Sequence, residues 1–253
     1  MSKGTAAPHS VRKGNEPTQL TLALDTAPAT SFSTFHADDG LDSGRLLASR
    51  SIEAFASGEL DEQQLYVWGE AGAGKSHLLT AACRRVGELG LRVAYVPGEL
   101  ANQPSALEGL ESCGLVCIDD LQRLDHGAET DLFHCINRCR AADTRLLFAA
   151  DRTVERLGLI LPDLATRLNW GPVFHIEPLA GVEILLALRR EFESRSLSAS
   201  DEVLSWIVRR YPRDMRAMKE LVDQLDQASL SEKRRLTVPF VRQVVEAAGT
   251  DGV

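Results

Sequence analysis

One glycine-rich segment constrains this chain more than any other feature of its sequence. The residues Gly69-Glu70-Ala71-Gly72-Ala73-Gly74-Lys75-Ser76 match the phosphate-binding pattern G-x-x-x-x-G-K-[ST] in full. The glycines let the backbone wrap closely around phosphates, and the positive end of the following helix faces the same anion. Lys75 then reaches the outer phosphates and the Ser76 hydroxyl ligates Mg²⁺. Because an apolar run precedes the pattern and a helical segment follows it, we prefer a nucleotide site to a flexible glycine turn.

Short apolar runs alternate with helical periodicities up to Pro178, and only helical periods follow it. Nearly continuous apolar strands separated by helices predict a parallel sheet covered on both faces. The expected strands are Leu65–Trp68, Arg92–Val96, Leu115–Ile118, Arg145–Ala150 and Val173–Glu177. The expected helices cover Leu41–Ser57, 75–89, 105–112, 128–141, 163–169, 181–195, 201–210, 213–228 and 237–247. We therefore expect an α/β fold in three parts: a tail at 1–29, a nucleotide-binding domain with five parallel strands at 30–178, and a small all-helical lid domain at 179–253.

Charge and cysteine content exclude several classes of function. The 253 residues carry 36 acids against 28 lysines and arginines, a formal charge of −8. This balance argues against a broad surface that neutralises nucleic-acid phosphates. No apolar run is long enough to cross a membrane and the N-terminus lacks a signal-peptide core, so we expect a cytoplasmic protein without a membrane partner. Five cysteines without metal-ligand spacing indicate a reducing compartment, and we expect no metal other than Mg²⁺.

Two acids end the strand expected over 115–118. The apolar run Leu115-Val116-Cys117-Ile118 leads directly into Asp119 and Asp120. A carboxylate at the C-terminal edge of the strand beside the phosphate loop can hold the water shell of Mg²⁺, and its neighbour can polarise an attacking water. We assign the metal side to Asp119 and the water side to Asp120. Taken alone, the pattern is equally typical of an ordinary strand end.

Two more polar residues follow later elements. Asp151 follows the strand expected over 145–150, and there it would sit between the loop and the acids and could sense the outermost phosphate. It fits an N-cap of the next helix equally well. Arg167 stands near the end of the helix expected over 163–169. An arginine there often neutralises the helix C-terminus. The alternative is an arginine finger that acts on a nucleotide held by a neighbouring subunit.

Together these segments resemble the AAA+ family, and within it the DnaA branch of bacterial replication proteins. The resemblance covers about Thr30 to Ala248. In order and spacing, five segments look like that branch's Walker A, Walker B, sensor 1, arginine-finger box and sensor 2: Gly69–Ser76, Ile118–Asp120, Ala150–Arg152, Arg167–Gly171 and Pro212–Arg216. The resemblance implies an AAA+ core with a helical lid that binds ADP or ATP with Mg²⁺. The implied nucleotide contacts are Gly69, Glu70, Ala71, Gly72, Ala73, Gly74, Lys75, Ser76, His77, Asp151 and the lid arginine Arg216.

Three departures separate this sequence from the initiators of that branch. The initiators carry a C-terminal helix-turn-helix domain, whereas this sequence ends shortly after the lid; they also insert a helical wedge before Walker B, where Pro97 to Gly114 supplies only 18 residues. The third departure, Gln19-Leu20-Thr21-Leu22-Ala23-Leu24, resembles the sliding-clamp-binding motif Gln-Leu-x-Leu-x-Leu. In an extended peptide such leucines fill a pocket and the glutamine amide fixes the register, although an edge strand shows the same alternation. The implied clamp contacts are Gln19, Leu20, Leu22 and Leu24.

With these departures, the resemblance is to the members of the branch that inactivate the initiator. It implies a protein that holds a nucleotide, in first place ADP, and docks on the DNA-loaded sliding clamp (the polymerase beta subunit). Such a protein presents Arg167 to ATP bound by DnaA and so prevents repeated initiation. Asp120 stands where many AAA+ ATPases have the longer Glu, so we expect slow turnover by the chain itself.

Rival interpretations remain open at the level of sequence. They are a DNA-stimulated ATPase of helicase-loader or transposition-helper type, a small-molecule P-loop kinase, and a structural clamp adaptor with a vestigial site. The acidic charge and the lack of a DNA-binding domain weigh against the first, so we expect no stable sequence-specific DNA binding. A homodimer that depends on nucleotide is a further expectation.

Overall fold

The computed structural model describes residues 30–36, 44–211, 215–232 and 234–247. Its centre is a parallel sheet of five strands: β1 (Gln64–Trp68), β2 (Val93–Pro97), β3 (Leu115–Asp119), β4 (Arg145–Ala150) and β5 (Val173–His175). The strands lie in the order β2-β3-β4-β1-β5, with every neighbouring pair parallel. The expectation of a five-stranded parallel sheet is confirmed.

The strand order corrects one expectation about the acids. We placed the strand that ends in Asp119 beside the strand that precedes the phosphate loop. In the structure β4 lies between them, because β1 pairs with β4 and β4 pairs with β3. Since all strands run parallel, their carboxyl ends still share one edge of the sheet. Asp151, directly after β4, lies between the loop and the acids, as expected.

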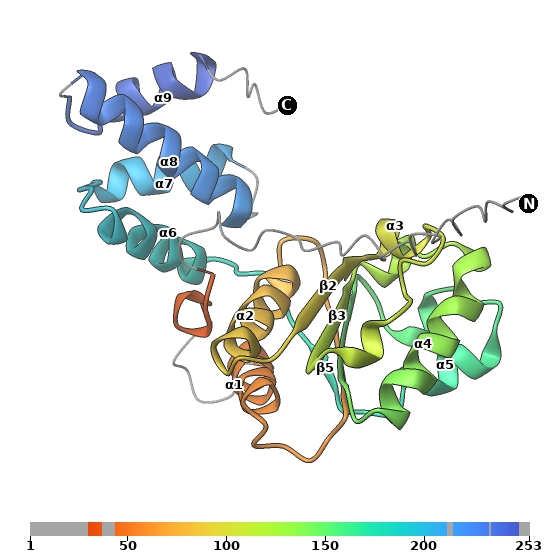
Figure 1. Ribbon diagram of the computed structural model, residues 1–253. Helices are drawn as coiled ribbons and strands as arrows, with labels where there is room; N and C mark the ends of the chain where they lie inside the picture. The colour runs from red at the N-terminus through yellow and green to blue at the C-terminus, as the bar shows by residue number, and fades with distance from the viewer. Residues whose placement is uncertain (1–29, 37–43, 212–214, 233, 248–253) are drawn as a thin grey trace, which may run out of the picture.

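Helices cover both faces of the sheet, as Figure 1 shows. Helices α1 (Gly44–Ser57) and α2 (Lys75–Glu88) pack on one face, where Ile52, Phe55 and Leu78 are fully buried. Helices α4 (Glu129–Ala141) and α5 (Pro162–Leu168) pack on the other face through a second apolar cluster. The near-continuous burial of β1, β3 and β4 follows from this double cover.

The helix expected over 105–112 is wrong. Only a short 3₁₀ turn, η3 (Leu110–Ser112), forms there, and a short helix, α3 (Gly98–Ala101), precedes it. Ser105 has φ of +63° and Gly109 has φ of +72°. These left-handed residues interrupt the helical backbone, so the apolar spacing around Leu107 serves a packed loop. Further 3₁₀ turns are η2 (Phe32–Thr34), η4 (Leu121–Arg123), η5 (His126–Ala128) and η6 (Val154–Arg156).

The C-terminal helices have an apolar core of their own. They are α6 (Val182–Ser194), α7 (Asp201–Arg210), α8 (Met215–Glu232) and α9 (Val238–Ala247). Leu188, Phe192, Leu221 and Phe240 are among their buried residues, and Figure 1 shows the four helices grouped away from the sheet. Among the described residues, no helix combines the length and apolar character needed to cross a membrane.

Candidate nucleotide-binding site

The phosphate loop connects the end of β1 to the start of α2. Gly74, the residue before α2, has φ of +96°, and a Cβ placed there would stand 2.8 Å from the Phe35 ring. Only glycine fits this backbone and this space. Within the described part of the chain, the amides of Gly72, Gly74 and Ser76 donate to no other group. The loop therefore presents N–H donors at a helix N-terminus, which suits a phosphate.

Lys75 is buried beneath the loop, with 7% of its surface exposed. Its ammonium donates to the carbonyls of Gly69 at 2.7 Å and Glu70 at 3.0 Å. Burial lowers the pKa of Lys75, while the charges of Asp119, Asp120 and Asp151 act in the opposite sense. The ammonium thus lies between loop and acids, where an outer phosphate of a nucleotide would meet it.

Asp119 is 2% exposed and accepts a hydrogen bond of 2.5 Å from the Tyr95 hydroxyl. Tyr95 comes from β2, and the side chain of Ser76 acts on the same phenol, lowering its pKa. One phenol therefore interacts with both expected Mg²⁺ ligands. Their hydroxyl and carboxylate oxygens fit Mg²⁺, which would neutralise phosphate charge when bound. Burial, with the charge of Asp119, raises the pKa of Tyr95, so the phenol stays protonated.

Asp120 has φ of +52°, an uncommon value for a residue other than glycine. Its carboxylate accepts a 2.8 Å bond from the Gln122 amide, whose oxygen accepts a 3.1 Å bond from the Asp151 backbone N–H. One glutamine thus links the water-side acid to the end of β4. The carboxylate of Asp151 pairs with Arg152 at 2.6 and 2.8 Å, which lowers its pKa. The N-cap alternative for Asp151 is wrong, because η6 is capped at Thr153.

Arg45 of α1 joins three segments around the loop. Its buried guanidinium donates to the carbonyls of His36 (2.9 and 3.1 Å), Ala73 (2.8 Å) and Glu177. The same group lies over the Phe35 ring, 4.7 Å from its centroid. Burial lowers the pKa of Arg45 to about 10, so it stays charged at neutral pH. It holds together the segment before α1, the phosphate loop and the segment after β5.

An open cleft lies beside the outer turn of the loop, where the chain leaves β5 for α6. Its volume is about 600 Å³, within the usual range for small-molecule pockets. Its lining residues are Glu70, Ala71, Gly72, His175, Glu177, Pro178, Leu179 and Ala180. His175 stacks on Trp68, with ring centroids 3.9 Å apart.

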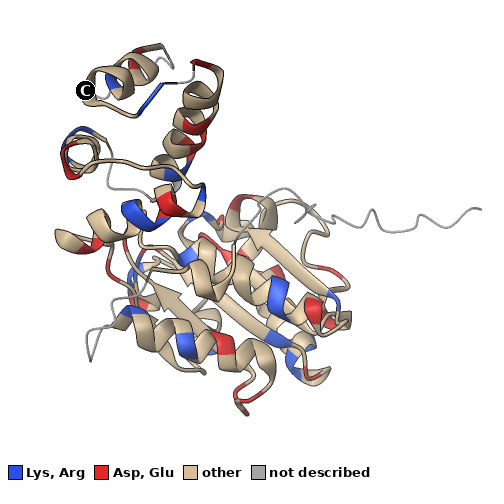
Figure 2. Cartoon of the chain, turned by 90° about the vertical axis from the view of Figure 1, so that its left-hand side faces the viewer, with Lys and Arg blue, Asp and Glu red and all other residues tan. Residues whose placement is uncertain are grey.

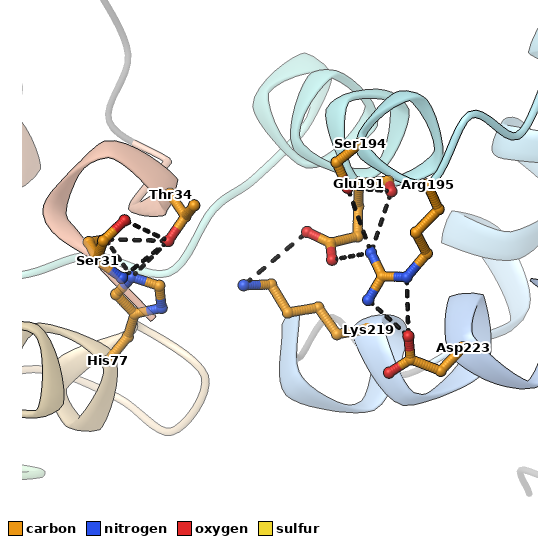
Figure 3. Close-up of polar contacts among 8 residues, drawn as sticks. All are labelled: Ser31, Thr34, His77, Glu191, Ser194, Arg195, Lys219 and Asp223. Atoms are coloured by element: carbon orange, nitrogen blue, oxygen red, sulfur yellow. Dashed lines mark hydrogen bonds and ion pairs between the residues drawn. The ribbon is translucent and has the colours of Figure 1, made fainter. Parts of the chain in front are cut away.

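Polar side chains of α6 and α8 lie across from His77 of α2 and from the segment before α1, as Figure 3 shows. The His77 Nε2 lies 2.9 Å from the carbonyl of Ser31, so its ring contacts the segment before α1. On the lid side, Lys219 and Arg195 both pair with Glu191, Lys219 at 3.9 Å. Arg216 falls in the first turn of α8, and its side chain lies outside what the structure describes.

Arg167 belongs to the opposite edge of the sheet. The side chain of Gln64, the first residue of β1, donates to the carbonyls of Arg167 at 2.9 Å and Leu168 at 3.0 Å. The phosphate loop follows Trp68, the last residue of β1, and a strand rises about 3.3 Å per residue. About 13 Å of strand therefore separates the two ends. The Arg167 guanidinium lies over Trp170, 3.7 Å from the ring centroid.

Sequence reasoning named the loop, the acids, Asp151 and Arg167 as site residues, and it did not name Tyr95, Arg45 or Gln122. The clamp-like hexapeptide Gln19–Leu24 lies outside the described residues. A tyrosine near the end of an apolar strand was a signal for Tyr95, because strand ends of a parallel sheet meet at the site. Nothing local marked Arg45, whose contacts lie 9, 28 and 132 residues away.

A P-loop protein of the AAA+ class is defined by these features together: a phosphate loop after β1, paired acids at the end of β3, a polar residue after β4 and a helical lid. Comparison with known families gives two matches. Residues 31–175 match the bacterial DnaA ATPase domain, and residues 183–245 match the lid domain of Hda. The chain belongs to the DnaA-related AAA+ family, and within it to the Hda type.

Solved structures show the same fold. Domain III of the Thermotoga maritima replication initiation protein DnaA has a TM-score of 0.74 at 21% identity, covering 87% of this chain and 97% of that one. A replication initiator DnaA bound to AMPPCP and single-stranded DNA has a TM-score of 0.68 at 20% identity. The match covers 82% of this chain and 69% of that one. A point mutant of Thermotoga maritima RuvB has a TM-score of 0.66 at 17% identity, and the match covers 88% of this chain and 73% of that one.

Proposed function

We propose that this protein negatively regulates replication initiation by promoting hydrolysis of ATP bound to DnaA. In this proposal, residues 30–178 and the lid at 179–253 hold ADP with Mg²⁺. The segment Gln19–Leu24 docks on the sliding clamp loaded on DNA, and Arg167 reaches the triphosphate held by the initiator. The Hda-type lid and the DnaA-like ATPase domain support a partner from the same family.

One observation carries the proposal more than any other: Arg167 and the chain's own phosphate loop lie at opposite ends of β1. An arginine side chain cannot span the length of the strand, so Arg167 cannot serve a nucleotide in its own loop. In the described part of the chain its guanidinium has no acidic partner and contacts only aromatic rings. An arginine held in this way suits phosphates presented by a second protein.

The proposal is tested by following hydrolysis of ATP preloaded on DnaA, with the clamp loaded on DNA. Arg167→Ala should retain ADP binding and clamp binding and lose the stimulation. The matched control is Arg84→Ala, which removes an exposed arginine that pairs with Glu88 at 3.1 Å in α2. Full stimulation by Arg167→Ala would overturn the proposed role of the finger.

Clamp docking is tested separately. Replacing Gln19 and Leu20 by Ala should abolish retention by the clamp without a change in melting temperature, because the lost contacts belong to the peptide and its pocket. The measurement is a pull-down with purified clamp. If the double variant is retained as well as the wild type, the hexapeptide is not the docking element.

A second candidate function is an ATPase that works on DNA by itself. The intact Lys75, Ser76, Asp119 and Asp120 favour it, because these residue types allow hydrolysis, although Asp120 replaces the longer Glu of many AAA+ ATPases. Against it, Figure 2 shows Lys and Arg interspersed with Asp and Glu along the ribbon of both parts of the chain. Rapid DNA-stimulated turnover by the purified chain, without clamp or DnaA, would favour this candidate.

A further inference from the structure

Two arginines share the ring of Trp170. The Cζ of Arg167 lies 3.7 Å from the centroid of this ring, and the Cζ of Arg140 lies 4.2 Å from it. Arg140 is in the last turn of α4, twenty-seven residues before Arg167 in sequence. Trp170 is 43% exposed, so the ring and its two cations reach the surface.

Neither arginine has a carboxylate within ion-pair distance in the part of the chain that the structure describes. The contrast with Arg138, on the same helix, is direct: Arg138 pairs with Glu111 at 3.3 Å. Acids outnumber bases in this chain by 36 to 28, so pairing partners are not scarce. Two half-buried guanidinium groups repel one another, and the negative face of an indole ring offsets part of that cost.

Contacts with the start of β1 hold the turn that carries Trp170. The Trp170 backbone N–H donates to the carbonyl of Arg167 at 3.2 Å, and the Gln64 amide holds the carbonyls of Arg167 and Leu168. At Gly171 a Cβ would stand 1.9 Å from the carbonyl oxygen of Gln64, so no other residue fits there. The turn that carries Trp170 therefore packs closely against the start of β1, with Gly171 at the point of closest approach.

We propose that Arg140 and Arg167, held on Trp170, form a two-arginine site for the triphosphate of a nucleotide bound to the partner. Arg140 contacts the phosphates beside Arg167, and Trp170 is a positioning residue that holds both guanidinium planes. The inference rests on the proposed function and names a second phosphate contact for it.

The chemistry favours a polyphosphate over a single carboxylate. Each guanidinium offers a planar fork of donors that matches two anionic oxygens, and a chain of phosphates supplies enough oxygens for both. A protein carboxylate neutralises one charge only. The site lies at the amino edge of the sheet, on the side away from the chain's own loop, so the phosphates must come from another protein.

The main test is the rate of hydrolysis of DnaA-bound ATP as the concentration of this protein is varied. Arg140→Ala should lower the maximal rate at least tenfold and leave the half-saturating concentration within about twofold, because the contact forms with the developing phosphate charge. Arg140→Lys should recover only part of the rate, since lysine lacks the fork. Arg84→Ala is the charge-matched control and should stimulate fully.

Trp170 is tested by rescue. Trp170→Ala should lower the maximal rate at least tenfold, whereas Trp170→Phe, which keeps an aromatic face, should retain most of it. If Trp170→Ala has a lowered melting temperature, Arg140→Ala decides the matter, because the Arg140 side chain makes no other described contact. Equal loss in Trp170→Ala and Trp170→Phe would contradict the positioning role.

The outcomes separate the inference from the function on which it rests. If Arg167→Ala stimulates like the wild type, the proposed function fails. If Arg167→Ala is inactive and Arg140→Ala is fully active, only the two-arginine site fails. A rise in half-saturating concentration alone for Arg140→Ala would make it a docking residue and would also overturn the inference. Loss of duplex oligonucleotide binding in place of the rate effect would identify a nucleic-acid surface instead.

Discussion

Charged side chains at the two edges of the sheet have different kinds of partner. At the carboxyl edge, charged groups have partners within the chain: Lys75 has two carbonyls, Asp119 has Tyr95, and Asp120 has Gln122. At the amino edge, the guanidinium groups of Arg140 and Arg167 meet only aromatic rings among the described residues. At the first edge the chain itself holds the charged groups in place. At the second edge, the described residues supply no acid to neutralise the two arginines.

The largest expected effect separates the edges by function. Arg167→Ala should reduce stimulation of DnaA-bound ATP hydrolysis by about 10³ or more, the usual magnitude for a finger supplied in trans. The affinity of the chain for ADP should not change, because the residue lies beyond reach of its loop. Calorimetry with ADP checks the second half. A loss of ADP affinity in this variant would break the distinction between the edges.

Lys75→Ala should affect the opposite edge. Losing a charge-assisted contact to phosphate should weaken ADP binding about ten- to a hundredfold by calorimetry. An affinity equal to that of the wild type would contradict the assignment of the phosphate loop. At saturating ADP, stimulation of the initiator should recover toward the wild-type rate, since Arg167 is untouched.

Tyr95→Phe tests how the phenol affects Mg²⁺ binding at the site. The Tyr95 hydroxyl donates to the carboxylate of Asp119, so Mg²⁺ must compete with it for that oxygen. Removing the hydroxyl should lower the Mg²⁺ concentration that half-saturates ADP binding about two- to tenfold. Tyr211→Phe, at the end of α7, is the control. A higher Mg²⁺ requirement in Tyr95→Phe would show that the phenol supports the ion.

The smallest expected effect concerns pH at the lid side of the site. Burial, with the nearby charge of Lys219, lowers the pKa of His36 from 6.5 to about 4, although Glu191 acts in the opposite sense. Arg190 and His77 also lower it. His36 therefore takes up a proton near pH 6.5 in the unfolded chain and only near pH 4 in the folded chain. Its contribution to stability is complete above pH 6.5 and is lost as the pH falls toward 4.

Melting temperatures at pH 7.5 and 5 measure the contribution of His36. The fall between the two should be a few degrees smaller in His36→Gln than in the wild type. His134→Gln, which removes an exposed histidine on α4, should fall as the wild type does. An identical fall in all three proteins would show that His36 does not couple stability to pH.

Sequence alone predicted the parts of this fold that depend on local patterns. The strands and most helices follow from continuous apolar runs and helical periods, and the phosphate loop follows from a complete motif. Periodicity identifies strands and not their neighbours, so the strand ending in Asp119 was expected beside β1, although Asp151 was correctly expected between the loop and the acids. The helix expected over 105–112 failed at backbone angles that the apolar spacing does not report.

The site residues show the same difference between local patterns and distant contacts. Residues with chemistry in the motif, such as Lys75 and Asp119, were named in advance. Residues that complete the site through distant contacts, such as Arg45 and Tyr95, were not. Arg140 and Trp170 are thirty residues apart in sequence and meet only because α4 and the turn before β5 end at one edge.

The most direct test of the central claim follows labelled ATP bound to DnaA, with this protein and the DNA-loaded clamp added singly and together. We predict conversion to ADP only when both are present, at a rate far above any turnover by this protein alone. No conversion in the complete mixture, with rapid hydrolysis by this protein on DNA without the clamp, would contradict the claim.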